Sequence, residues 1–586
     1  MENIEIARVL RETADLLEIQ AANPFRIRAY RNAVRTIEAQ TVPMRKLVEE
    51  GANLTELPAI GKGMAENIEE IIRTGVLGVL SELSEQIPEG LIDLVKLPGL
   101  GSKKARKLWE ELGIESIEDL EKAAAEGRIS ELVGFGMKTE ERILEEIENF
   151  RTNISRFRIG EVDDLLSPLL EHMRAVSGVQ RIEVAGSYRR RCETIGDIDL
   201  LALASDPVKV SEGLVGFSGV DRVLGSGLAK TSVMLRSGLQ VDLRVVPTDS
   251  WGAALIYFTG SKEHNIKLRQ RALERQLRVS EYGIFEIPDE SLSDTIGERG
   301  LASEGKMVAG DSEESVYEAL GLPWLPPEMR EDRGELTVAD ANQLPNLIEQ
   351  SDLKGDVHMH STWSDGRDSL EEMVQACKSR GYEYMAITDH SKALAMVKGL
   401  DAEKLSRQWV EIDEVQSRHQ GIRILKGMEV DILRDGSLDL EDELLDRLDI
   451  VIVSIHSHFR LERSEQTERV LKALSHPRAM IFGHPTGRII NRRSPIEIDI
   501  EEILQACAEF SVAVELNSNP NRLDLRDTHL WRARELNIPV LITTDAHRTE
   551  GLALAHYGVE QARRAWLTSQ HVLNTCSIDD FLARIG

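Results

Sequence analysis

The sequence predicts a multidomain chain with three parts: an all-α front region, an α+β middle region and a parallel α/β barrel at the end. Three observations predict this order. Glycine-centred turns separate helical segments before residue 150, and apolar strands with aspartates follow to about residue 325. Seven strand–helix units whose strands end in histidines and acids complete the chain. A length of 586 residues allows roughly three or four domains of about 150 residues.

The composition limits the classes of protein. A net charge of -29 argues against uniform coating of DNA, although local basic patches can still bind it. No apolar run approaches the roughly 18 residues of a membrane span, and the acidic, amphipathic segment 1–20 does not resemble a signal peptide. The four cysteines are far apart and form no CxxC pair. We therefore expect a reduced, cytoplasmic protein without a membrane contact.

Three glycine turns recur in the helical front region: LPAIGKG (57–63), LPGLGSK (97–103) and LVGFGMK (132–138). Each precedes a helix, the pattern of a hairpin between helices, and its amides can bind a backbone phosphate. A purely structural turn is the alternative, but the recurrence, with lysines after two turns, favours DNA binding without sequence preference. The candidate DNA contacts are Gly61, Gly99, Gly101, Lys103, Gly134 and Gly136, together with Arg26, Arg28 and Arg31 in the basic stretch 23–35.

Three aspartates mark the α+β region. In GDIDLLALA (196–204), Asp197 and Asp199 share one face of a predicted strand, because strand side chains alternate. Asp242 lies in phase on a second predicted strand, LQVDLRVVP (239–247). If the strands are neighbours, the three carboxylates can hold two hard divalent cations such as Mg²⁺ or Mn²⁺. A surface D-x-D on an edge strand is the alternative.

A basic turn precedes these aspartates. Gly186 and Ser187 offer backbone amides and a hydroxyl to phosphate oxygens, and Arg190 supplies a cation at the same end. Cations at the aspartates would lower the pKa of an attacking hydroxyl and neutralise a triphosphate leaving group. The pattern therefore predicts nucleotidyl transfer.

At these residues the chain resembles the X family of DNA polymerases, which includes DNA polymerase beta, over about 1–330. The resemblance rests on G-S-x-R-R (186–190), G-D-x-D (196–199), the strand around Asp242 and Y-F-T-G-S (257–261). It implies a nucleotidyltransferase palm with a thumb, and gapped or primed DNA and deoxynucleoside triphosphates as substrates. The resemblance also implies roles for single residues. Catalytic metal ligands are implied at Asp197, Asp199 and Asp242, and contacts to the triphosphate at Gly186, Ser187, Arg190 and Gly196. Tyr257, Phe258 and Gly260 would form a wall on the sugar side, Asn265 would contact the minor groove and Arg269 the template strand.

One position departs from this family. Some members remove a 5′-deoxyribose phosphate through a Schiff-base lysine, which aligns here with Asn67, while a nearby phosphate-contacting lysine aligns with Gly63. An amide cannot form an imine, and Lys62 is offset by several residues. We therefore expect little lyase activity, although Arg26 still aligns with a 5′-phosphate contact.

The final part concentrates the histidines, since twelve of the fourteen follow residue 350. The predicted strands end in GDVHMH, YMAITDH, RILKGMEV, IVIVSIHSH, AMIFGHP, SVAVELN and VLITTDAH. Nitrogen and oxygen ligands without a thiolate suit two or three ions such as Mn²⁺, Zn²⁺ or Fe²⁺, which can activate water against phosphorus. The candidate ligands are His358, His360, Asp365, His390, Glu429, His456, His484, Asp545 and His547, with Glu429 as the expected bridge. His458 and His476 stay undecided, and Lys392 and Arg488 can bind phosphate or backbone.

These strand ends resemble the PHP (polymerase and histidinol phosphatase) domain over about 353–575. The matching motifs are HxH, SDG, TDH, GxE, SIHSH, GHP and TDAH. The resemblance implies a distorted (βα)₇ barrel, a trinuclear metal site and phosphoester hydrolysis. With its front half, the chain resembles the bacterial and archaeal DNA polymerase X family, whose PHP part is associated with 3′–5′ exonuclease, 3′-end cleaning and abasic-site cleavage.

The predicted function is a DNA repair enzyme, most simply a monomer, that fills short gaps and trims or cleans 3′ ends. The expected domains are a helical domain (1–85), a fingers-like subdomain (86–150), the palm (151–252), a thumb-like subdomain (253–330), a linker (331–352) and the PHP barrel (353–586). One alternative is a small-molecule phosphatase, such as one acting on histidinol phosphate, with a non-catalytic DNA-binding front half. Another is a DNA-end-binding scaffold. The intact polymerase residues argue against the phosphatase, and complete ligand sets at both sites argue against the scaffold.

Overall fold

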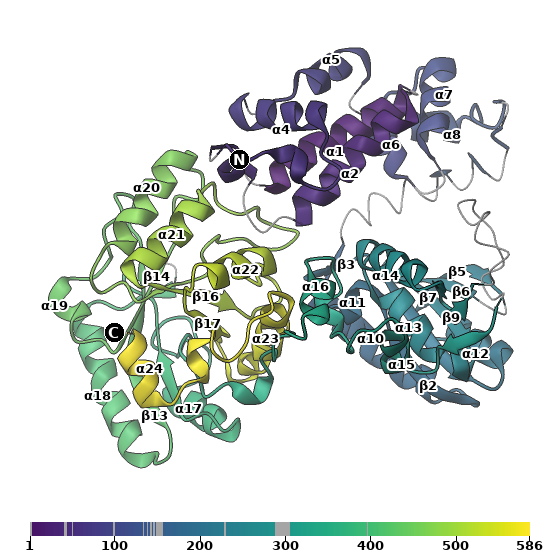
Figure 1. Cartoon of the computed structure of the whole chain (residues 1–586). Coiled ribbons are helices and arrows are strands. Elements are labelled where there is room, and N and C mark those ends of the chain that lie inside the picture. Colours follow the sequence, from purple (N-terminus) through teal and green to yellow (C-terminus); the bar gives the residue numbers. More distant parts are fainter. Residues whose placement is uncertain are drawn as a thin grey trace. The chain divides into compact units, whose positions relative to one another are not determined.

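A computed structural model gives the fold of the chain (Figure 1). It describes residues 3–20, 22–39, 44–49, 51–74, 76–88, 90–97, 100–132, 134–136, 139–140, 143–144, 147, 156–227, 230–287, 305–394 and 397–585. Contacts divide the chain into two compact units, 1–155 and 156–586.

The secondary-structure elements described in the first unit are all helical, as predicted. Its elements are α1 (Asn3–Ile19), α2 (Pro24–Ala39), α3 (Met44–Glu49), the 3₁₀ turn η1 (Leu54–Glu56), α4 (Lys62–Thr74), α5 (Gly78–Gln86), α6 (Gly90–Lys96), α7 (Ser102–Leu112) and α8 (Ile117–Ala125). Helices α4 and α7 begin directly after Gly61 and Gly101, where the first two glycine turns end. Leu10, Ile68 and Leu108 are fully buried in one shared apolar core.

The second unit begins with a five-stranded sheet, the palm. Its strand order is β2 (Val179–Val184), β4 (Asp197–Ala204), β7 (Gln240–Val246), β6 (Lys230–Leu235) and β5 (Val220–Ser226). Strands β4 and β7 are parallel neighbours. Helices α10 (Ile159–Arg174), α11 (Gly186–Arg189) and α12 (Pro207–Val215) and the short pair β1 (Phe157–Arg158) and β3 (Thr194–Ile195) complete this region. Ile198, Leu200 and Val241 are fully buried against the helices, so the alternation predicted from the sequence is correct.

The thumb-like region combines helices with a small antiparallel sheet. Its elements are η2 (Thr248–Ser250), α13 (Trp251–Thr259), α14 (Lys262–Glu274), β8 (Leu277–Ser280), β9 (Gly283–Glu286), β10 (Met307–Ala309), α15 (Glu313–Ala319) and the 3₁₀ turn η4 (Pro327–Met329). Ser261 caps α14 by accepting a hydrogen bond from His264 N at 3.1 Å. This cap places α14 directly after the glycine turn that ends α13.

Seven parallel strands form the barrel, in sequence order from β11 to β17. They are β11 (Gly355–Asp356), β12 (Tyr384–Ile387), β13 (Arg423–Asp431), β14 (Ile450–Ser454), β15 (Ile481–Phe482), β16 (Ala513–Asn517) and β17 (Val540–Thr543). His360 N donates to Ala546 O at 2.8 Å, so the segments that follow the first and last strands meet and nearly close the barrel. The predicted seven-unit barrel is confirmed.

Helices cover the outside of this barrel (Figure 1, green to yellow). They are α17 (Leu370–Ser379), α18 (Ala402–Arg418), α19 (Asp442–Leu445), α20 (Arg463–Leu474), α21 (Ile500–Phe510), α22 (Asp527–Glu535), α23 (Ala555–Arg564) and α24 (Ile578–Ile585), with the 3₁₀ segments η7 (Thr549–Leu554) and η8 (Leu573–Thr575). Every residue of β12, β14 and β16 is buried, because these strands are covered on both faces. The polar strand ends are consequently left to form a site.

The segment 331–352, expected to be a linker, is instead a packed connection. It contains α16 (Glu335–Asp340) and the 3₁₀ turn η5 (Gln350–Asp352). Leu347 is buried with Met329, Trp531 and Trp566 in one apolar cluster. The apolar side chains interspersed in this polar stretch explain the difference, because burying them ties the thumb region to the barrel.

Buried charges join the polymerase-like region to the barrel within residues 156–586. Glu331 accepts hydrogen bonds from Arg190 Nε and from Arg564 Nη1, both at 2.9 Å. Asp527 accepts from Arg564 Nη2 and Arg333 Nη2, each at 2.9 Å. Burial alone would raise the pKa of Glu331, but the guanidiniums of Arg564, Arg190 and Arg333 outweigh it and hold the pKa at about 2. We call this set of five residues the charge seam.

Two further contacts run alongside the charge seam. Glu193 accepts from both terminal nitrogens of Arg488, at 3.1 and 2.6 Å. Asp163 accepts from the hydroxyls of Tyr188 and Tyr557, each at 2.6 Å. Palm and barrel are therefore held together by paired groups.

Among the described ranges, no helix has both the length and the apolar composition that crossing a membrane requires.

Candidate active sites

Three aspartates lie on one face of the palm sheet. Parallel pairing puts Asp199 opposite Asp242, and Asp197 lies two residues earlier on β4, opposite Gln240. Because positions two apart on a strand point the same way, all three carboxylates share a face, as the sequence phase predicts. Asp242 is buried, Asp199 is half-buried and Asp197 is exposed, so the cluster opens to solvent at one end.

The aspartates repel one another. Burial and the negative charges of Asp197 and Asp242 raise the pKa of Asp199 to about 6. Burial also raises the pKa of Asp242, but hydrogen bonds, led by the one from Lys230, lower it overall. Lys230 Nζ lies 2.8 Å from Asp242 Oδ2, and Gln240 Nε2 donates to Oδ1 at 3.1 Å. Crowded carboxylates of this kind fit hard divalent cations, which would relieve the repulsion.

The turn before these strands closely approaches the aspartates. Gly186 has φ +65°, and a Cβ there would lie 2.9 Å from Asp199 Oδ2. Only glycine therefore allows both this backbone conformation and the close approach. Ser187 follows in α11, and Gly196 lies exposed directly before Asp197.

The arginines of the basic turn are ion-paired. Arg190 donates from Nε to Glu331 at 2.9 Å and from Nη1 to Thr259 O at 2.7 Å, and only 14% of its side chain is exposed. Arg189 holds both oxygens of Glu313, at 2.7 and 2.9 Å. The Arg190 guanidinium is therefore ion-paired with Glu331, and its hydrogen bond to Thr259 O anchors the turn to the end of α13.

The residues expected around the nucleotide sugar and base lie at the α13–α14 junction. Asn265 Nδ2 donates to Tyr257 O at 2.7 Å and to Gly260 O at 3.2 Å. The rings of Tyr257 and Phe258 meet edge to face, with centroids 5.0 Å apart. Arg269, one turn beyond Asn265, is exposed. Four of the five residues therefore lie together where α13 ends and α14 begins, whereas Arg269 faces solvent.

All nine candidate ligands of the barrel gather at its carboxyl-terminal strand ends. Three groups have ligand atoms within 4.8 Å of one another: His360, Asp365, His390 and His547; His358, His360 and Asp545; and His390, Glu429 and His456. His484 joins them through Glu429, whose Oε1 lies 2.9 Å from its Nε2. His360 and His390 each belong to two groups, so the groups form one continuous centre.

Glu429 occupies the middle of this centre. Its carboxylate lies 3.0 Å from His390 Nδ1, 3.3 Å from His456 Nε2 and 3.4 Å from His358 Nε2. Both of its oxygens, His358 Nε2 and His484 Nδ1 are buried without a hydrogen-bond partner among the described residues. Buried polar atoms are normally satisfied, so these orphaned atoms fit bound cations.

The protonation states also fit ligands. Burial lowers the pKa of His360 to about 3, helped by the neighbouring His547 and His390, so its imidazole is neutral. Burial opposes protonation of His390 too, but Glu429 and Asp365 outweigh it and raise its pKa to about 10. A divalent cation can replace that proton between the same groups.

Sequence reasoning missed a surrounding layer of acids. Glu515, on β16, accepts from His358 Nδ1 and from Thr543 Oγ1, each at 2.5 Å. Asp431 lies 3.2 Å from His456 Nδ1. The strand SVAVELN carries the signal for Glu515, since an acid inside a buried strand needs a partner.

Other barrel candidates lie away from the ligands. Arg488, expected to bind phosphate, pairs with Glu193, and Lys392 Nζ donates to Glu441 at 3.4 Å. His458 and His476 join none of the ligand groups found in the described part of the chain.

The helical unit presents its candidate DNA contacts unevenly. Arg26 and Arg28 are exposed on α2, whereas Arg31 pairs with Asp15, at 3.3 Å, and with Glu18. The space around a Cβ at Gly61, Gly101, Gly134 or Gly136 is open, and Lys103 is exposed in the first turn of α7. Gly99 lies outside the described residues.

Family comparisons match four segments. They are a helix-hairpin-helix domain (1–77), a SAM-like helix-hairpin-helix tandem (91–149), a DNA polymerase beta thumb (254–331) and a PHP domain (356–519).

Curated relatives extend these matches. The chain is 40% identical over 583 residues to the DNA polymerase/3′-5′ exonuclease PolX of Bacillus subtilis (strain 168), covering 99% of this chain and 98% of that protein. It is 29% identical over 328 residues to DNA polymerase lambda of Arabidopsis thaliana, covering 52% and 57% of the two chains. It is 27% identical over 235 residues to a probable phosphatase of Thermoanaerobacter sp. (strain X514), covering 38% of this chain and 89% of that one.

Proposed function

This chain belongs to the PolX family of DNA polymerase/3′-5′ exonucleases, and from that premise we propose a division of labour between its two centres. The chain is a DNA polymerase of the gap-filling repair type joined to a 3′–5′ exonuclease. The aspartate centre of the palm extends the primer, and the histidine centre of the barrel shortens it. The gathering of eight other candidate ligands around Glu429, separate from the aspartate cluster, is the observation that carries this division.

At the aspartate centre, Asp197, Asp199 and Asp242 hold Mg²⁺ or Mn²⁺. Such cations lower the pKa of the primer 3′-hydroxyl and neutralise the triphosphate when bound. Gly186 and Ser187 contact the phosphates through amides and a hydroxyl, supported by the close approach of the turn to Asp199. Arg190 and Gly196 complete the phosphate end in the proposal, with Arg190 held in place by the charge seam.

Around the nucleotide, Tyr257, Phe258 and Gly260 form the wall that disfavours a ribonucleotide. Asn265 is positioned for the minor groove by its hydrogen bonds to the end of α13. Arg269 faces the template strand, supported by its exposure one turn along the same helix.

At the histidine centre, the nine candidate ligands would hold two or three ions such as Mn²⁺, Zn²⁺ or Fe²⁺, with Glu429 as their central carboxylate. Bound cations there supply activated water at neutral pH and neutralise a phosphodiester. His360 contributes a neutral imidazole, and Glu515 fixes the orientation of His358.

The helical unit binds gapped or primed DNA without sequence preference. Open glycine turns before α4 and α7, and the exposed Arg26, Arg28 and Lys103, support phosphate contacts there. The matched segments 1–77, 91–149 and 254–331 overlap the proposed helical domain, fingers-like subdomain and thumb, and the match over 356–519 lies inside the proposed PHP barrel. A monomer in the cytoplasm is the simplest form of this proposal.

Removal of 3′-phosphates is a second candidate activity of the barrel, together with cleavage at abasic sites. The match that spans 89% of a probable phosphatase favours it. A labelled primer ending in a 3′-phosphate tests it, because dephosphorylation leaves a product of unchanged nucleotide length, whereas exonuclease cleavage removes the phosphate together with the terminal nucleotide. A small-molecule phosphatase with an inert front half is disfavoured, because similarity to PolX spans 99% of the chain.

The test uses a one-nucleotide gapped duplex with a labelled primer and a 5′-phosphate. The full-length chain is incubated with Mn²⁺, with and without deoxynucleotides, and the products are resolved by length. We expect extension with nucleotides and shortening without them. Extension alone would contradict the exonuclease, and shortening alone would contradict the polymerase.

A further inference from the structure

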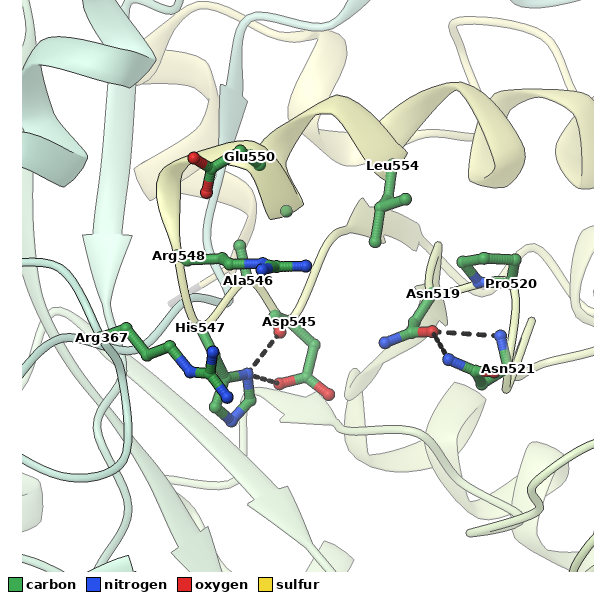
Figure 2. Close-up of a pocket in the computed structure, with 11 residues that line it drawn as sticks. Arg367, Asn519, Pro520, Asn521, Asp545, Ala546, His547, Arg548, Glu550 and Leu554 are labelled. Atoms are coloured by element: carbon green, nitrogen blue, oxygen red, sulfur yellow. Dashed lines mark hydrogen bonds and ion pairs between the residues drawn. The ribbon is translucent and has the colours of Figure 1, made fainter. Parts of the chain in front are cut away.

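A hollow of about 450 Å³ opens beside the histidine centre (Figure 2). Two metal-ligand candidates, Asp545 and His547, form one side of it. The other sides come from the loop after β11, which carries Arg367, the loop after β16 and the segment leading into α23. The volume lies within the roughly 300–1,000 Å³ range of ligand sites. The hollow is therefore large enough for part of a substrate whose end reaches the metal ligands.

Two arginines give the hollow a positive side. Arg367 and Arg548 are exposed, and neither guanidinium has a hydrogen-bond or ion-pair partner among the described residues. Their backbones are nevertheless fixed to the ligand segment, since Arg367 N donates to His547 O at 2.7 Å and Arg548 follows His547 directly. Figure 2 shows the Glu550 carboxylate directed away from Asp545. Two guanidiniums without partners in the described part of the chain, on backbones held beside metal-ligand candidates, are suited to phosphodiester oxygens.

The opposite side offers an amide and an apolar surface. Asn519 Oδ1 accepts hydrogen bonds from the backbone and side-chain nitrogens of Asn521, at 3.0 and 2.9 Å, so its Nδ2 remains available as a donor. Leu554 lines the same hollow and packs against the apolar cluster around Ile159 and Tyr557. These groups can contact a sugar edge and a sugar face.

The palm supports this side of the hollow. Arg158 Nη1 donates to Asn521 Oδ1. At Gly160 a Cβ would lie 2.9 Å from Pro520 Cγ, so the start of α10 packs directly on the loop after β16. The loop is consequently braced by the polymerase half and presents a constant surface.

We infer that this hollow is the subsite for the DNA strand that enters the histidine centre. It takes the nucleotide next to the 3′ end, with Arg367 and Arg548 on the phosphodiester and Leu554 against the sugar. The inference rests on the proposed exonuclease, for which it assigns the residues that bind the strand, not those that hold cations.

The test compares DNA with a small phosphodiester on the full-length chain. A 5′-labelled single-stranded oligonucleotide and bis(p-nitrophenyl) phosphate are each hydrolysed in Mn²⁺ by the wild type, Arg367→Ala, Arg548→Ala and the double variant. We expect kcat/KM on DNA to fall on the order of tenfold for each arginine, mainly through KM, because each loses a charge-assisted hydrogen bond. The double variant should lose at least about tenfold more on DNA than on the small diester. Arg380→Ala is the matched control, since Arg380 is exposed and precedes β12 at the other end of the barrel.

Methylphosphonate substitution identifies the contacted phosphate. One neutral linkage placed one nucleotide inside the scissile linkage should slow the wild type but not the double variant, whereas a linkage ten nucleotides away should affect both equally. Unchanged DNA shortening by the double variant, or an equal loss on both substrates, would overturn the subsite alone. A wild type that does not shorten DNA would overturn the exonuclease and the subsite together.

Discussion

The aspartate centre of the palm and the histidine centre of the barrel place their ligands in different surroundings. Asp197, Asp199 and Asp242 come from two adjacent strands, and the cluster is exposed at Asp197. The histidine centre draws on the ends of six strands, and His358, His360 and Glu429 are at most 1% exposed. An open face suits ions that arrive with each nucleotide, whereas a closed end suits resident ions.

The two centres also differ in what surrounds the ligands. Asp242 is contacted by Lys230 and Gln240, whose flexible side chains can yield to a cation. His358 and His456 are held by the buried acids Glu515 and Asp431. We therefore expect the histidine centre to depend on a second layer of residues.

Removing the central carboxylate should break the histidine centre alone. In Glu429→Ala, at least four imidazoles lose their shared partner, so we expect 3′ shortening to fall on the order of 1,000-fold or more, as for loss of a unit of catalytic groups. Gap filling should stay near the wild-type rate. Glu443→Ala, at an exposed glutamate of α19, is the control. Comparable loss of gap filling in a folded variant would mean that the centres are not separate.

Changing Glu515, which contacts a candidate ligand and is not one itself, tests whether the histidine centre depends on a second layer of residues. Glu515→Gln keeps the size of the side chain but removes the charge that orients His358, so metal affinity or 3′ shortening should fall by about 10–100-fold. Metal content and activity measured across a Mn²⁺ titration would detect this. Added Mn²⁺ should restore much of the activity, and an unaltered titration would contradict the role of the outer acid.

The charge seam should contribute strongly to the stability of residues 156–586. Glu331→Gln leaves Arg190 without its carboxylate partner and Arg564 with only Asp527, and breaking a buried pair costs about 3–5 kcal/mol of unfolding free energy. Glu468→Gln, at an exposed site on α20, should change little. Denaturant unfolding monitored for both variants gives the difference.

Glu331 should also make the free energy of unfolding depend on pH. The pKa of Glu331 is about 2 in the folded chain, below the roughly 4.3 of an unfolded glutamate. Its contribution is therefore fully present above about pH 4.5 and is lost as the pH falls toward 2. The stability gap between wild type and Glu331→Gln should narrow over that interval, and a constant gap would contradict the ion pair.

The smallest expected signal is that of 5′-deoxyribose-phosphate lyase activity, which we expect to be nearly absent from the helical unit. Asn67 Nδ2 donates to the Tyr30 hydroxyl at 2.8 Å, so the position of the family's imine-forming lysine is filled by a bonded amide. Borohydride should trap little adduct with a 5′-deoxyribose-phosphate substrate. A strong adduct that disappears in Lys62→Ala would contradict this.

The sequence predicted which side chains meet in the two clusters because each cluster follows a local period. The alternation of side chains along β4 and β7 predicted that the aspartates share one face, and the shared edge of parallel strand ends predicted that the histidines lie close together. Contacts between distant segments could not be read in this way. Nothing in the sequence indicated that Arg190 and Arg488 pair with carboxylates far along the chain, Glu331 and Glu193. Such pairs depend on how folded regions dock, which no motif records.

The most direct test of two independent centres uses paired double variants on the gapped duplex. With Mn²⁺, Asp197→Ala with Asp199→Ala should abolish extension and leave 3′ shortening intact, while His358→Ala with His360→Ala should do the reverse. Two independent centres predict this result, in which each double variant loses one activity and keeps the other. Loss of both activities in either variant, with the fold verified by circular dichroism and thermal unfolding, would contradict it.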